Sequence, residues 1–571
     1  MILKIVFPIL FCMIFQGCIS AQTKIEKIDR LVSINAGYGN FNGSILVVEQ
    51  GKVIYKKAFG KADFDKNILN KTDTKFRLAS VSKQFTAMLI MQLVAENKLN
   101  LNVPVTTYLP EYPAENGGKI TIHHLLAHTS GLPNYTSFPN YRDIMGTPKS
   151  PGELVRLFSE LALEFNPGEN FSYSNSGYIL LGYLIEKVTG KKYEQVLTEK
   201  IFDPLNMVNS GYDHNDALAT NMASGFDKKL NSYVSASYLD MSVPFAAGAL
   251  YSTVEDLALW DQALYTEKLL PKKYMDQMFK KQTPPNGPGY GYGWMTGARS
   301  VGNSGEKIES VSHGGSINGF NTIIVRIPSD KILITILNNT GEAPLNEMAQ
   351  SILGILYDKP YDVPQRSLSA ALLEVLESKG PDSALIFYNS NKSSKEYLMR
   401  EDEMNTAGYQ MLQNGKAKEA ALLFRLNTEA YPNSFNTYDS YGEVLLVLGD
   451  TTASIENYKK SVKLNSENDG GIEVLKSLGV NTDDLIIKVS VAHLKLLSGE
   501  YKEEGKEWKI IIEEKDGQLY GNDGGYRYRL NPVGNDKFIN PDDGATIEFN
   551  TENKHSLSFV IFGKTKLIKV K

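Results

Sequence analysis

Three short stretches of the chain carry side chains that could make and break an acyl bond. In Ser80-Val81-Ser82-Lys83, a hydroxyl and an amine lie three residues apart. Residues three apart share one face of a helix, so these two groups can meet. A serine hydroxyl is a weak nucleophile until a base takes its proton, and a lysine can be that base when burial or neighbouring positive charge lowers its pKa. The free backbone N–H groups at a helix start also suit an oxyanion.

The second and third stretches could complete such a site. Tyr173-Ser174-Asn175 lies between Pro167-Gly168 and an apolar run with helical spacing, on a loop of the kind that often carries site residues. Its phenol could relay protons, and its amide could donate to a substrate carbonyl. His313-Gly314-Gly315-Ser316 comes before the strand-like residues 322–327, and its glycines would let a substrate lie along a strand edge.

None of these motifs is specific alone. A second Ser-x-x-Lys, at Ser304–Lys307, lies in a glycine-rich loop where the shared-face argument fails. Tyr-x-Asn also occurs at Tyr38, Tyr431 and Tyr520, and a lone His-Gly-Gly is more often a turn than a site. The surrounding sequence therefore favours Ser80 over the copy in the loop.

The elements that would position these residues form a mixed α+β pattern. Residues 43–55 alternate like a hairpin with Gly51 at its turn, and residues 322–337 are two apolar runs around a turn at residues 328–330. Helical spacing covers Arg77 to Val94 and Asn346 to Leu356. Strands at both ends with helices between them predict an antiparallel sheet, flanked by helices, whose edges come from distant sequence.

Composition excludes several classes of protein. The 571 residues indicate about three domains, and the 42% hydrophobic and 22% charged fractions exclude global disorder. Lys and Arg total 60 against 65 Asp and Glu, so the chain lacks the basic excess of a general nucleic-acid binder. The two cysteines, Cys12 and Cys18, leave the rest of the chain without an internal disulfide or a thiolate metal site.

The N-terminus predicts export. A basic start is followed by the apolar run Ile5 to Phe15, too short to span a bilayer as a helix, and then by small residues. Residues 1–21 are therefore interpreted as a signal peptide, with a buried N-terminal helix as the alternative. Ordinary cleavage after Ala21 is favoured over lipoprotein processing at Cys18, because Phe15-Gln16 is a poor approach to a lipid-attachment site. The mature protein is expected in the periplasm or outside the cell, soluble or lipid-tethered, with no transmembrane span.

Two further domains are expected after the first, which covers residues 22–360. Residues 361–484 are interpreted as a helical linker, broken at Pro364 and Gly380-Pro381, followed by about two repeats with a 34-residue period. Matching small residues, such as Gly408 and Gly442, make this segment similar to tetratricopeptide repeats; a plain helical bundle is the alternative. Residues 485–571 carry short strand-like runs separated by Asp-Gly turns, which predict a small antiparallel sheet or barrel.

Taken together, the three motifs resemble the serine β-lactamase and penicillin-binding protein superfamily. They occur in the order of that superfamily, separated by 93 and 140 residues. The nearest likeness is the class C β-lactamase-like branch, which includes D,D-peptidases, D-amino-acid peptidases and esterases. The stretches 124–132, 201–207, 246–260 and 289–294 also look like that branch. The resemblance covers about residues 25 to 360 and implies a β-lactamase/transpeptidase-like fold.

The resemblance implies a catalytic role for three residues. Ser80 would be the acylated nucleophile, and Lys83 would be its general base. Tyr173 would pass protons to the leaving group and activate the deacylating water. No metal or other cofactor is expected, and the nearby histidines, His123, His124 and His128, are interpreted as part of the family-like stretch rather than as metal ligands.

The resemblance also implies substrate contacts. Asn175 would orient the substrate amide, Gly315 would lie along the substrate, and the backbone N–H groups of Ser80 and Ser316 would hold the oxyanion. The β-lactamases proper carry Lys-Thr-Gly where this chain carries His313-Gly314-Gly315. A histidine with an ordinary pKa near 6.5 is mostly neutral at pH 7, so it is a weaker partner for a substrate carboxylate than a lysine.

The leading prediction is an exported serine hydrolase that forms an acyl-enzyme with an ester, amide or peptide. Within this class, hydrolysis of D-amino-acid peptides from cell wall is the runner-up, and a true β-lactamase is the third. From another class, the chain could be a non-catalytic cell-envelope scaffold that recruits a protein partner through its repeats. The retained serine, lysine and tyrosine argue against that alternative.

Overall fold

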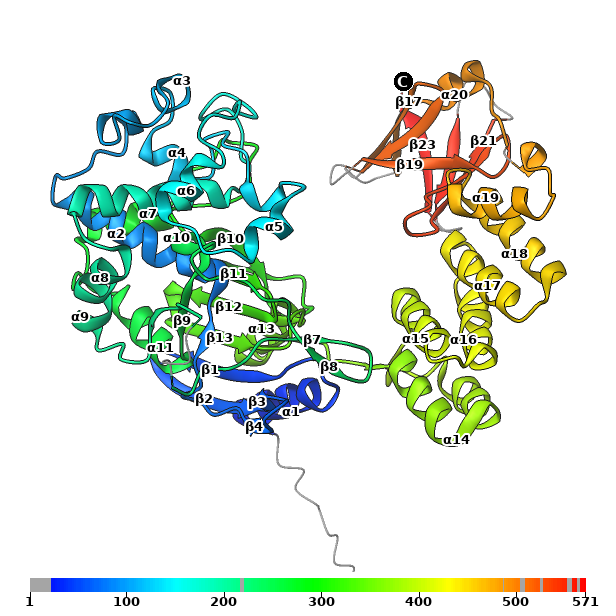
Figure 1. The fold of residues 1–571 in the computed structure, drawn as a ribbon, viewed down its shortest axis with the longest axis horizontal. Helices are drawn as coiled ribbons and strands as arrows, with labels where there is room; N and C mark the ends of the chain where they lie inside the picture. Colours follow the sequence, from blue (N-terminus) through cyan, green and yellow to red (C-terminus); the bar gives the residue numbers. More distant parts are fainter. Residues whose placement is uncertain are drawn as a thin grey trace, which may run out of the picture. The chain divides into compact units, whose positions relative to one another are not determined.

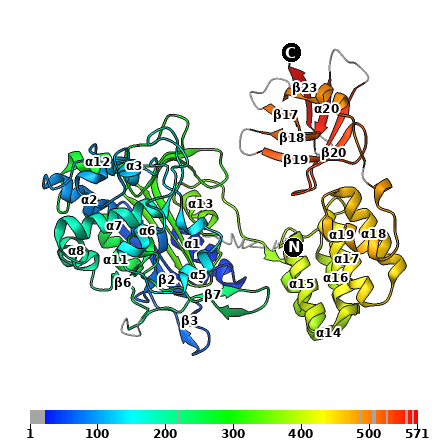
Figure 2. The ribbon, with the colours of Figure 1, turned by 45° about the horizontal axis from the view of Figure 1, so that its top comes forward.

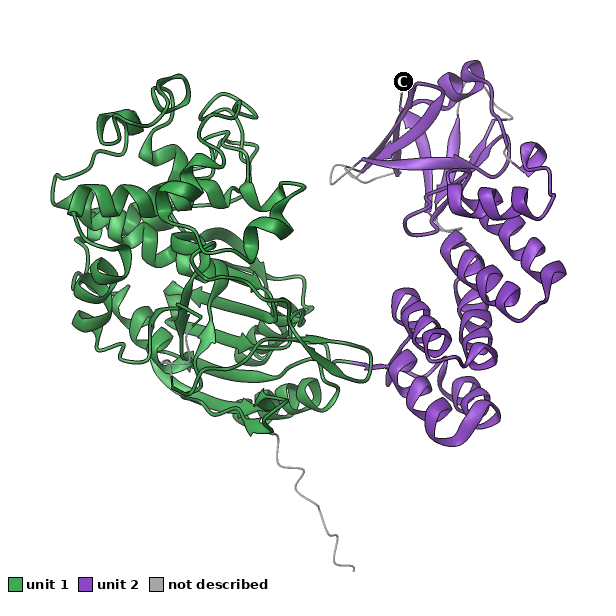
Figure 3. Ribbon diagram, viewed as in Figure 1, with its two compact units in different colours: residues 1–364 green, residues 365–571 purple. Residues whose placement is uncertain are grey.

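The computed structural model describes residues 22–215, 220–485, 487–503, 509–523, 527–551, 557–561 and 565–570. The predicted signal peptide, residues 1–21, and both cysteines lie outside the described residues. Among the described residues, no helix is both long and apolar enough to cross a bilayer. The chain divides into two compact units between Pro364 and Gln365 (Figure 3). The expected domain boundaries at 21/22, 360/361 and 484/485 stay predictions.

The first unit is built on a six-stranded antiparallel sheet with the order β10-β11-β12-β13-β1-β2. Both predicted hairpins are confirmed, as β1 with β2 and as β12 with β13. β1 also pairs with β13, with Gly43 opposite Asn338, so the sheet joins the two ends of this unit. Its strands are β10 (Met295–Ser300), β11 (Lys307–Ile317), β12 (Phe320–Ile327), β13 (Ile332–Asn338), β1 (Gly43–Glu49) and β2 (Lys52–Phe59).

Both faces of this sheet are buried, which explains why its central strands are nearly continuous apolar runs. On one face, α1 (Lys24–Gly37) and α13 (Leu345–Leu356) lie side by side (Figure 1 and Figure 2). They form one core with Ile45 and Val47 of β1, whereas the alternate residues Leu46 and Val48 belong to a second, larger core. The larger core contains the helices α2 (Lys83–Ala95), α7 (Asn175–Thr189) and α11 (Val254–Ala263).

The remaining helices and strands of the first unit are short (Figure 1). The helices are α3 (Ala114–Gly117), α4 (Ile122–Leu126), α5 (Tyr141–Met145), α6 (Pro151–Arg156), α8 (Tyr193–Leu197), α9 (Asp203–Leu205), α10 (Phe245–Gly248) and α12 (Lys272–Phe279). The strands are β3 (Lys61–Asp63), β4 (Ile68–Leu69), β5 (Phe76–Arg77), β6 (Gly211–Tyr212), β7 (Phe226–Lys228), β8 (Tyr233–Ser235) and β9 (Leu250–Ser252).

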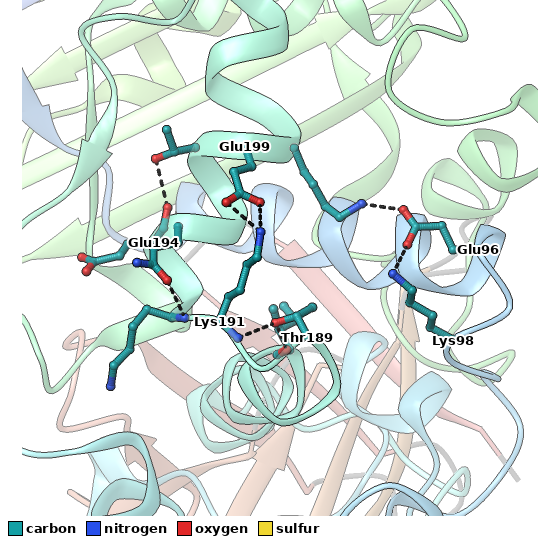
Figure 4. Close-up of polar contacts among 11 residues, drawn as sticks. Glu96, Lys98, Thr189, Lys191, Glu194 and Glu199 are labelled. Carbon is teal, nitrogen blue, oxygen red and sulfur yellow. Dashed lines mark hydrogen bonds and ion pairs between the residues drawn. The ribbon is translucent and has the colours of Figure 1, made fainter.

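On the surface of this unit, lysine and glutamate side chains form a small group of ion pairs (Figure 4). Lys98 Nζ lies 2.9 Å from Glu96 Oε2, and Lys191 Nζ lies 2.6 Å from Glu199 Oε2. Exposed pairs of this kind contribute about 0–1 kcal/mol each. The stability of the unit therefore comes from its two cores rather than from this group.

The helix predicted over Arg77 to Val94 begins later than expected. Phe76–Arg77 form β5, which pairs with β9 and is therefore extended. The chain then turns at Ala79, whose φ is +50°, and passes through the 3-10 helix η1 (Ala79–Ser82) before α2 begins. The strand pairing is a tertiary contact, so helical spacing alone placed the helix start too early.

The second unit begins with helices in pairs. Its helices are α14 (Leu368–Asn391), α15 (Glu401–Gln413), α16 (Ala417–Ala430), α17 (Phe435–Val447), α18 (Thr451–Leu464), α19 (Asp469–Ser477) and α20 (Val491–Leu497). The predicted break at Gly380-Pro381 is confirmed, because Gly380 has φ +80° and ψ 178°. The pair α17–α18 starts 34 residues after the pair α15–α16. A Cβ added to Gly408 or Gly442 would lie within 3 Å of a ring on the next helix, so small residues allow the close packing; the assignment to tetratricopeptide repeats stays a prediction.

The small β domain predicted at the C-terminus is confirmed as a closed barrel of eight strands. Apolar side chains of alternate residues, such as Tyr501, Phe538 and Phe559, fill its interior. The barrel strands are β16 (Gly499–Glu503), β17 (Lys509–Lys515), β18 (Gln518–Asn522), β19 (Arg527–Pro532), β20 (Lys537–Ile539), β21 (Thr546–Asn550), β22 (Ser558–Ile561) and β23 (Thr565–Val570). One short strand pair also belongs to this unit: β14 (Arg366–Ser367) runs parallel to β15 (Tyr397–Leu398).

Candidate active site

Ser80 lies in η1, on the turn that connects β5 to the buried helix α2. The left-handed backbone at Ala79 is costly for a residue with a Cβ, and such strain is often found where a reactive side chain is held. Thr322 of β12 donates its hydroxyl to Leu78 O at 2.9 Å and so fastens the turn to the sheet. Ser80 is half-buried, in contrast to the fully buried Ser82 that follows it.

Lys83 is the first residue of α2, and its amine contacts three oxygen atoms. Lys83 Nζ lies 3.0 Å from Ser80 Oγ, 2.8 Å from Asn175 Oδ1 and 2.9 Å from the carbonyl oxygen of Ala247. The hydroxyl and the amine of the Ser-x-x-Lys motif therefore meet. Ala247 lies in α10, which the sequence did not connect to the site.

The surroundings of Lys83 favour its neutral form. The side chain is 0% exposed, and every residue of α2 from Lys83 to Leu93 is buried. Burial removes the water that stabilises an ammonium ion and holds the pKa of Lys83 well below its usual value. The lowered pKa shifts the amine toward the neutral form that a general base needs.

Tyr173 reaches this amine from the loop before α7. The centroid of its ring lies 4.9 Å from Lys83 Nζ. Burial raises the pKa of Tyr173 above its usual value, and a hydrogen bond with the Ser80 hydroxyl opposes this rise in part. The hydroxyl, the amine and the phenol thus converge from two remote parts of the chain, as the sequence predicts.

Asn175, the first residue of α7, uses both ends of its amide within the protein. Its Oδ1 accepts from Lys83 Nζ, and its Nδ2 donates to Thr136 Oγ1 at 3.1 Å. Its backbone N–H donates to Asn134 Oδ1 at 3.0 Å. The predicted contact between Asn175 and a substrate amide stays a prediction, and it would replace or share the contact with Thr136.

The third motif lies on β11, directly against the serine turn. Gly315 is buried, and a Cβ there would lie 2.2 Å from Leu78 O and 2.5 Å from Thr322 Oγ1. The absence of a side chain at Gly315 therefore allows β11 to approach the turn that carries Ser80. Ser316 follows on the same strand and is exposed.

His313, on the same strand, faces the protein interior. The residue is 4% exposed, its Nε2 lies 3.0 Å from the hydroxyl of Tyr290, and its Nδ1 donates to Gly314 O at 2.6 Å. Burial and then the nearby Lys83 lower the pKa of His313 to about 4, so the ring is neutral at pH 7. Its predicted contact with a substrate stays a prediction.

The competing copies of the motifs lie elsewhere. Ser304 donates its hydroxyl to Val301 O on the loop before β11, and Lys307 is the first residue of that strand. Tyr38 follows α1, Tyr431 follows α16 and Tyr520 lies in β18 of the other unit. None of these tyrosines lies in an element that contributes to the convergence at Lys83.

The three histidines that the sequence does not favour as metal ligands each have a different hydrogen-bond partner. His123 Nδ1 lies 2.8 Å from the hydroxyl of Tyr292, and His124 Nδ1 accepts from the backbone N–H of Thr121 at 3.2 Å. His128 Nε2 lies 3.2 Å from the hydroxyl of Tyr290. His128 and Tyr290 lie in stretches that look like the family, but the sequence assigns neither of them a role, because their burial against each other is visible only in the structure.

Comparison with known proteins agrees with this geometry. A family model described as Beta-lactamase matches residues 28–356. Penicillin-binding protein 4* of Bacillus subtilis (strain 168) is 33% identical over 367 residues, which cover 60% of this chain and 79% of that protein. Protein flp of Staphylococcus aureus (strain MRSA252) is 29% identical over 335 residues; the match covers 57% of this chain and 65% of flp, slightly less than two thirds.

Solved structures show the same fold. The octameric penicillin-binding protein homologue from Pyrococcus abyssi is 23% identical, with a TM-score of 0.52, and the match covers 95% of this chain and 99% of that one. The D-amino acid amidase from Ochrobactrum anthropi SV3, complexed with D-phenylalanine, is 24% identical, with a TM-score of 0.50 over 57% of this chain and 99% of that one. The first match extends over residues of both units.

Proposed function

The chain belongs to the beta-lactamase family, and on this premise we propose that it is an exported serine hydrolase, acting on an ester, amide or peptide through an acyl-enzyme on Ser80. In acylation, Ser80 Oγ forms a bond to the substrate carbonyl carbon while its proton moves to Lys83 Nζ. The bond from that carbon to the leaving group then breaks, and the leaving group takes the proton through Tyr173. In deacylation, water adds to the acyl carbon, the bond from that carbon to Ser80 Oγ breaks, one proton of the water goes to Ser80 Oγ, and the acid product leaves.

The contacts of Lys83 are the observation that carries this proposal. Asn175 Oδ1 and the carbonyl oxygen of Ala247 can only accept hydrogen bonds, so both need an N–H of the amine. A neutral amine has two N–H groups, and these two acceptors occupy both. Its remaining lone pair is then directed at the third partner, Ser80 Oγ, 3.0 Å away. An ammonium ion would instead donate to all three oxygens, and the burial that lowers the pKa of Lys83 favours the arrangement in which a neutral amine accepts the serine proton.

Backbone groups supply the proposed electrostatic stabilisation. The N–H groups of Ser80, at the start of η1, and of Ser316, on β11, would donate to the oxyanion that forms on the substrate. Losing one such donor costs about 3–4 kcal/mol of barrier in other enzymes. The close approach of β11 to the turn at Gly315 supports this pairing.

The acyl donor is proposed to be an ester, an amide or a D-amino-acid peptide rather than a β-lactam antibiotic. The residue at the position of the β-lactamase lysine, His313, is neutral and buried. It therefore provides no fixed positive charge for a substrate carboxylate. Hydrolysis of D-amino-acid peptides is the runner-up within this class. His313→Lys should improve carboxylate-bearing substrates more than neutral esters, and equal effects on both would show that residue 313 does not face the carboxylate.

Active-site labelling tests the proposal. The full chain is incubated with a fluorophosphonate or a fluorescent penicillin, and the modified residue is found by mass spectrometry. An adduct on Ser80 is expected in the wild type and in Ser304→Ala, the matched control in the second Ser-x-x-Lys, but not in Ser80→Ala. Absence of any adduct, together with tight binding of a protein to the helical pairs, would favour the scaffold alternative.

A further inference from the structure

Three buried side chains next to Tyr173 form a hydrogen-bonded chain that the acylation mechanism does not use. His128, Tyr290 and His313 are 1%, 2% and 4% exposed. The Tyr290 hydroxyl lies 3.2 Å from Nε2 of His128 and 3.0 Å from Nε2 of His313. The hydroxyl therefore lies between the two histidines, of which His128 follows α4 and His313 lies on β11.

The outer ends of this chain allow only one arrangement of protons for neutral rings. Nδ1 of His128 accepts from the backbone N–H of Ser174 at 3.1 Å, so its proton must lie on Nε2. Nδ1 of His313 faces Gly314 O at 2.6 Å and must donate to it, which leaves its Nε2 as an acceptor. With these tautomers, Tyr290 can accept from His128 and donate to His313. Its hydroxyl also has a hydrogen bond with the hydroxyl of Tyr178, which in turn donates to Leu126 O.

His128 also holds the backbone on both sides of the proposed proton relay. Its carbonyl oxygen accepts from the backbone N–H of Ser172 at 2.9 Å, while its ring nitrogen accepts from that of Ser174. Between these two amides lies Tyr173, whose ring centroid is 4.2 Å from that of His128, with the planes 33° apart. His128 has φ +57°, a left-handed conformation that a residue other than glycine seldom adopts.

We propose that His128 is a positioning residue for Tyr173, and that Tyr290 and His313 fix the tautomer of His128 that this position requires. The inference rests on the proposed function, because it assigns Tyr173 a place in the proton path. If Tyr173 is displaced by about 1 Å, the rate of the catalysed reaction should fall by about 10²-fold, because reacting groups must be held in position.

The charged and titratable groups around His128 support a neutral ring. Burial holds the pKa of His128 well below its usual value, and the neighbouring Lys83 and His313 lower it further. The other rings that face it belong to Phe171, Tyr173, Tyr178 and Tyr290, and none of these carries positive charge. A protonated ring would lose its contact with the Ser174 amide, because two N–H groups would then face each other.

Two substitutions at one position separate positioning from simple packing. In His128→Asn, Oδ1 can take the place of Nδ1 as acceptor, and Asn tolerates the left-handed backbone. In His128→Ala, the acceptor and the ring are both lost. With a nitrophenyl ester, His128→Ala should lower kcat by about 100-fold with KM within about threefold, and His128→Asn should recover most of that loss. Wild-type kcat in His128→Ala, or a His128→Asn variant as slow as His128→Ala, would overturn the proposal.

A tyrosine pair provides the matched control for the tautomer. Tyr290→Phe removes the hydroxyl that joins the two histidines, while Tyr292→Phe removes an equivalent hydroxyl bound to His123, two residues away in the same stretch. Tyr290→Phe should lower kcat, and Tyr292→Phe should leave it unchanged. Equal losses in both variants would show that the chain of hydrogen bonds has no specific role.

A measurement that needs no activity keeps this inference apart from the proposed function. In ¹⁵N-histidine-labelled full chain at pH 7, the resonances lost in His128→Asn should belong to a neutral ring protonated on Nε2. Those lost in His313→Asn should belong to a neutral ring protonated on Nδ1. If the wild type cleaved no ester but showed these tautomers, the proposed function would fail while the positioning would stand; an Nδ1-protonated His128 would overturn the positioning even in an active enzyme.

Discussion

Replacing Gly315 with Ala should disrupt the site without changing any of its reactive side chains. The added Cβ would lie 2.2 Å from Leu78 O, 2.5 Å from Thr322 Oγ1 and 3.1 Å from Ala79 Cβ. To restore a normal separation of about 3.5 Å, β11 and the serine turn must move apart by about 1 Å. The proposed oxyanion donors belong to these two segments, so one would be displaced from the other. Overpacking of this kind costs about 1–3 kcal/mol of stability, and a lost oxyanion donor costs about 10²–10³ in rate.

The neighbouring glycine provides a control for this prediction. A Cβ added to Gly314 would meet only Thr322 O, at 3.7 Å, which is an ordinary contact. Acylation by a nitrophenyl ester, followed by stopped flow, and thermal unfolding should therefore be close to wild type in Gly314→Ala and reduced in Gly315→Ala. A Gly315→Ala variant that acylates within about tenfold of the wild type would refute the placement of the oxyanion site between β11 and the turn.

Three further predictions follow from the buried polar groups. Lys83→Met should abolish acylation. Because the pKa of Lys83 is lowered in the folded state, the wild type should gain about 1.4 kcal/mol of unfolding free energy per pH unit as pH rises toward 10.5, and Lys83→Met should lack this gain; chemical denaturation of both proteins measures it, and parallel stabilities would refute the lowered pKa. Tyr173→Phe should leave the fold intact and slow turnover more than the first acylation, and an unchanged turnover rate would remove the phenol from the proton path. His313→Asn should not change the pH dependence of kcat/KM above pH 5, because the pKa of His313 is about 4 and the ring does not titrate in that range. A pH profile that shifts above pH 5 in this variant would show that His313 titrates there.

The main elements and the three motifs could be predicted from the sequence because each depends on local pattern. The hairpins at β1–β2 and β12–β13 follow from two apolar runs around a turn, and their positions were confirmed. The meeting of Ser80 and Lys83 follows from a spacing of three residues, which brings the two groups together even though Ser80 lies in a 3-10 turn rather than in the helix. The eight-stranded barrel was predicted as a sheet or barrel, because strand patterns do not show whether the last strand pairs with the first.

The contacts that tune the site could not be predicted, because they are made between distant segments. Ala247 contributes only a backbone oxygen, which any residue type could supply, so no motif marks it. His313 was predicted to face the substrate because the family motif lies along a substrate strand, and its burial against Tyr290 becomes visible only when the strand and the 289–294 stretch are brought together. The start of α2 depends on the pairing of β5 with β9, some 170 residues later.

Burying Lys83 lowers the free energy of unfolding, and the apolar core around the site must offset this loss. A lysine at the surface would be protonated at pH 7 and could not accept the serine proton. Full burial in the centre of the larger core lowers its pKa, but it also destabilises the fold, since the unfolded chain binds a proton that the folded chain does not. The apolar helix α2 and the surrounding core offset that cost through their buried area. The same burial keeps His128 and His313 neutral, so one property of the core sets the protonation of the base and of the hydrogen-bonded chain behind Tyr173. A substitution that admitted water beside Lys83 should therefore raise the pKa of the lysine toward its usual value and slow acylation at pH 7.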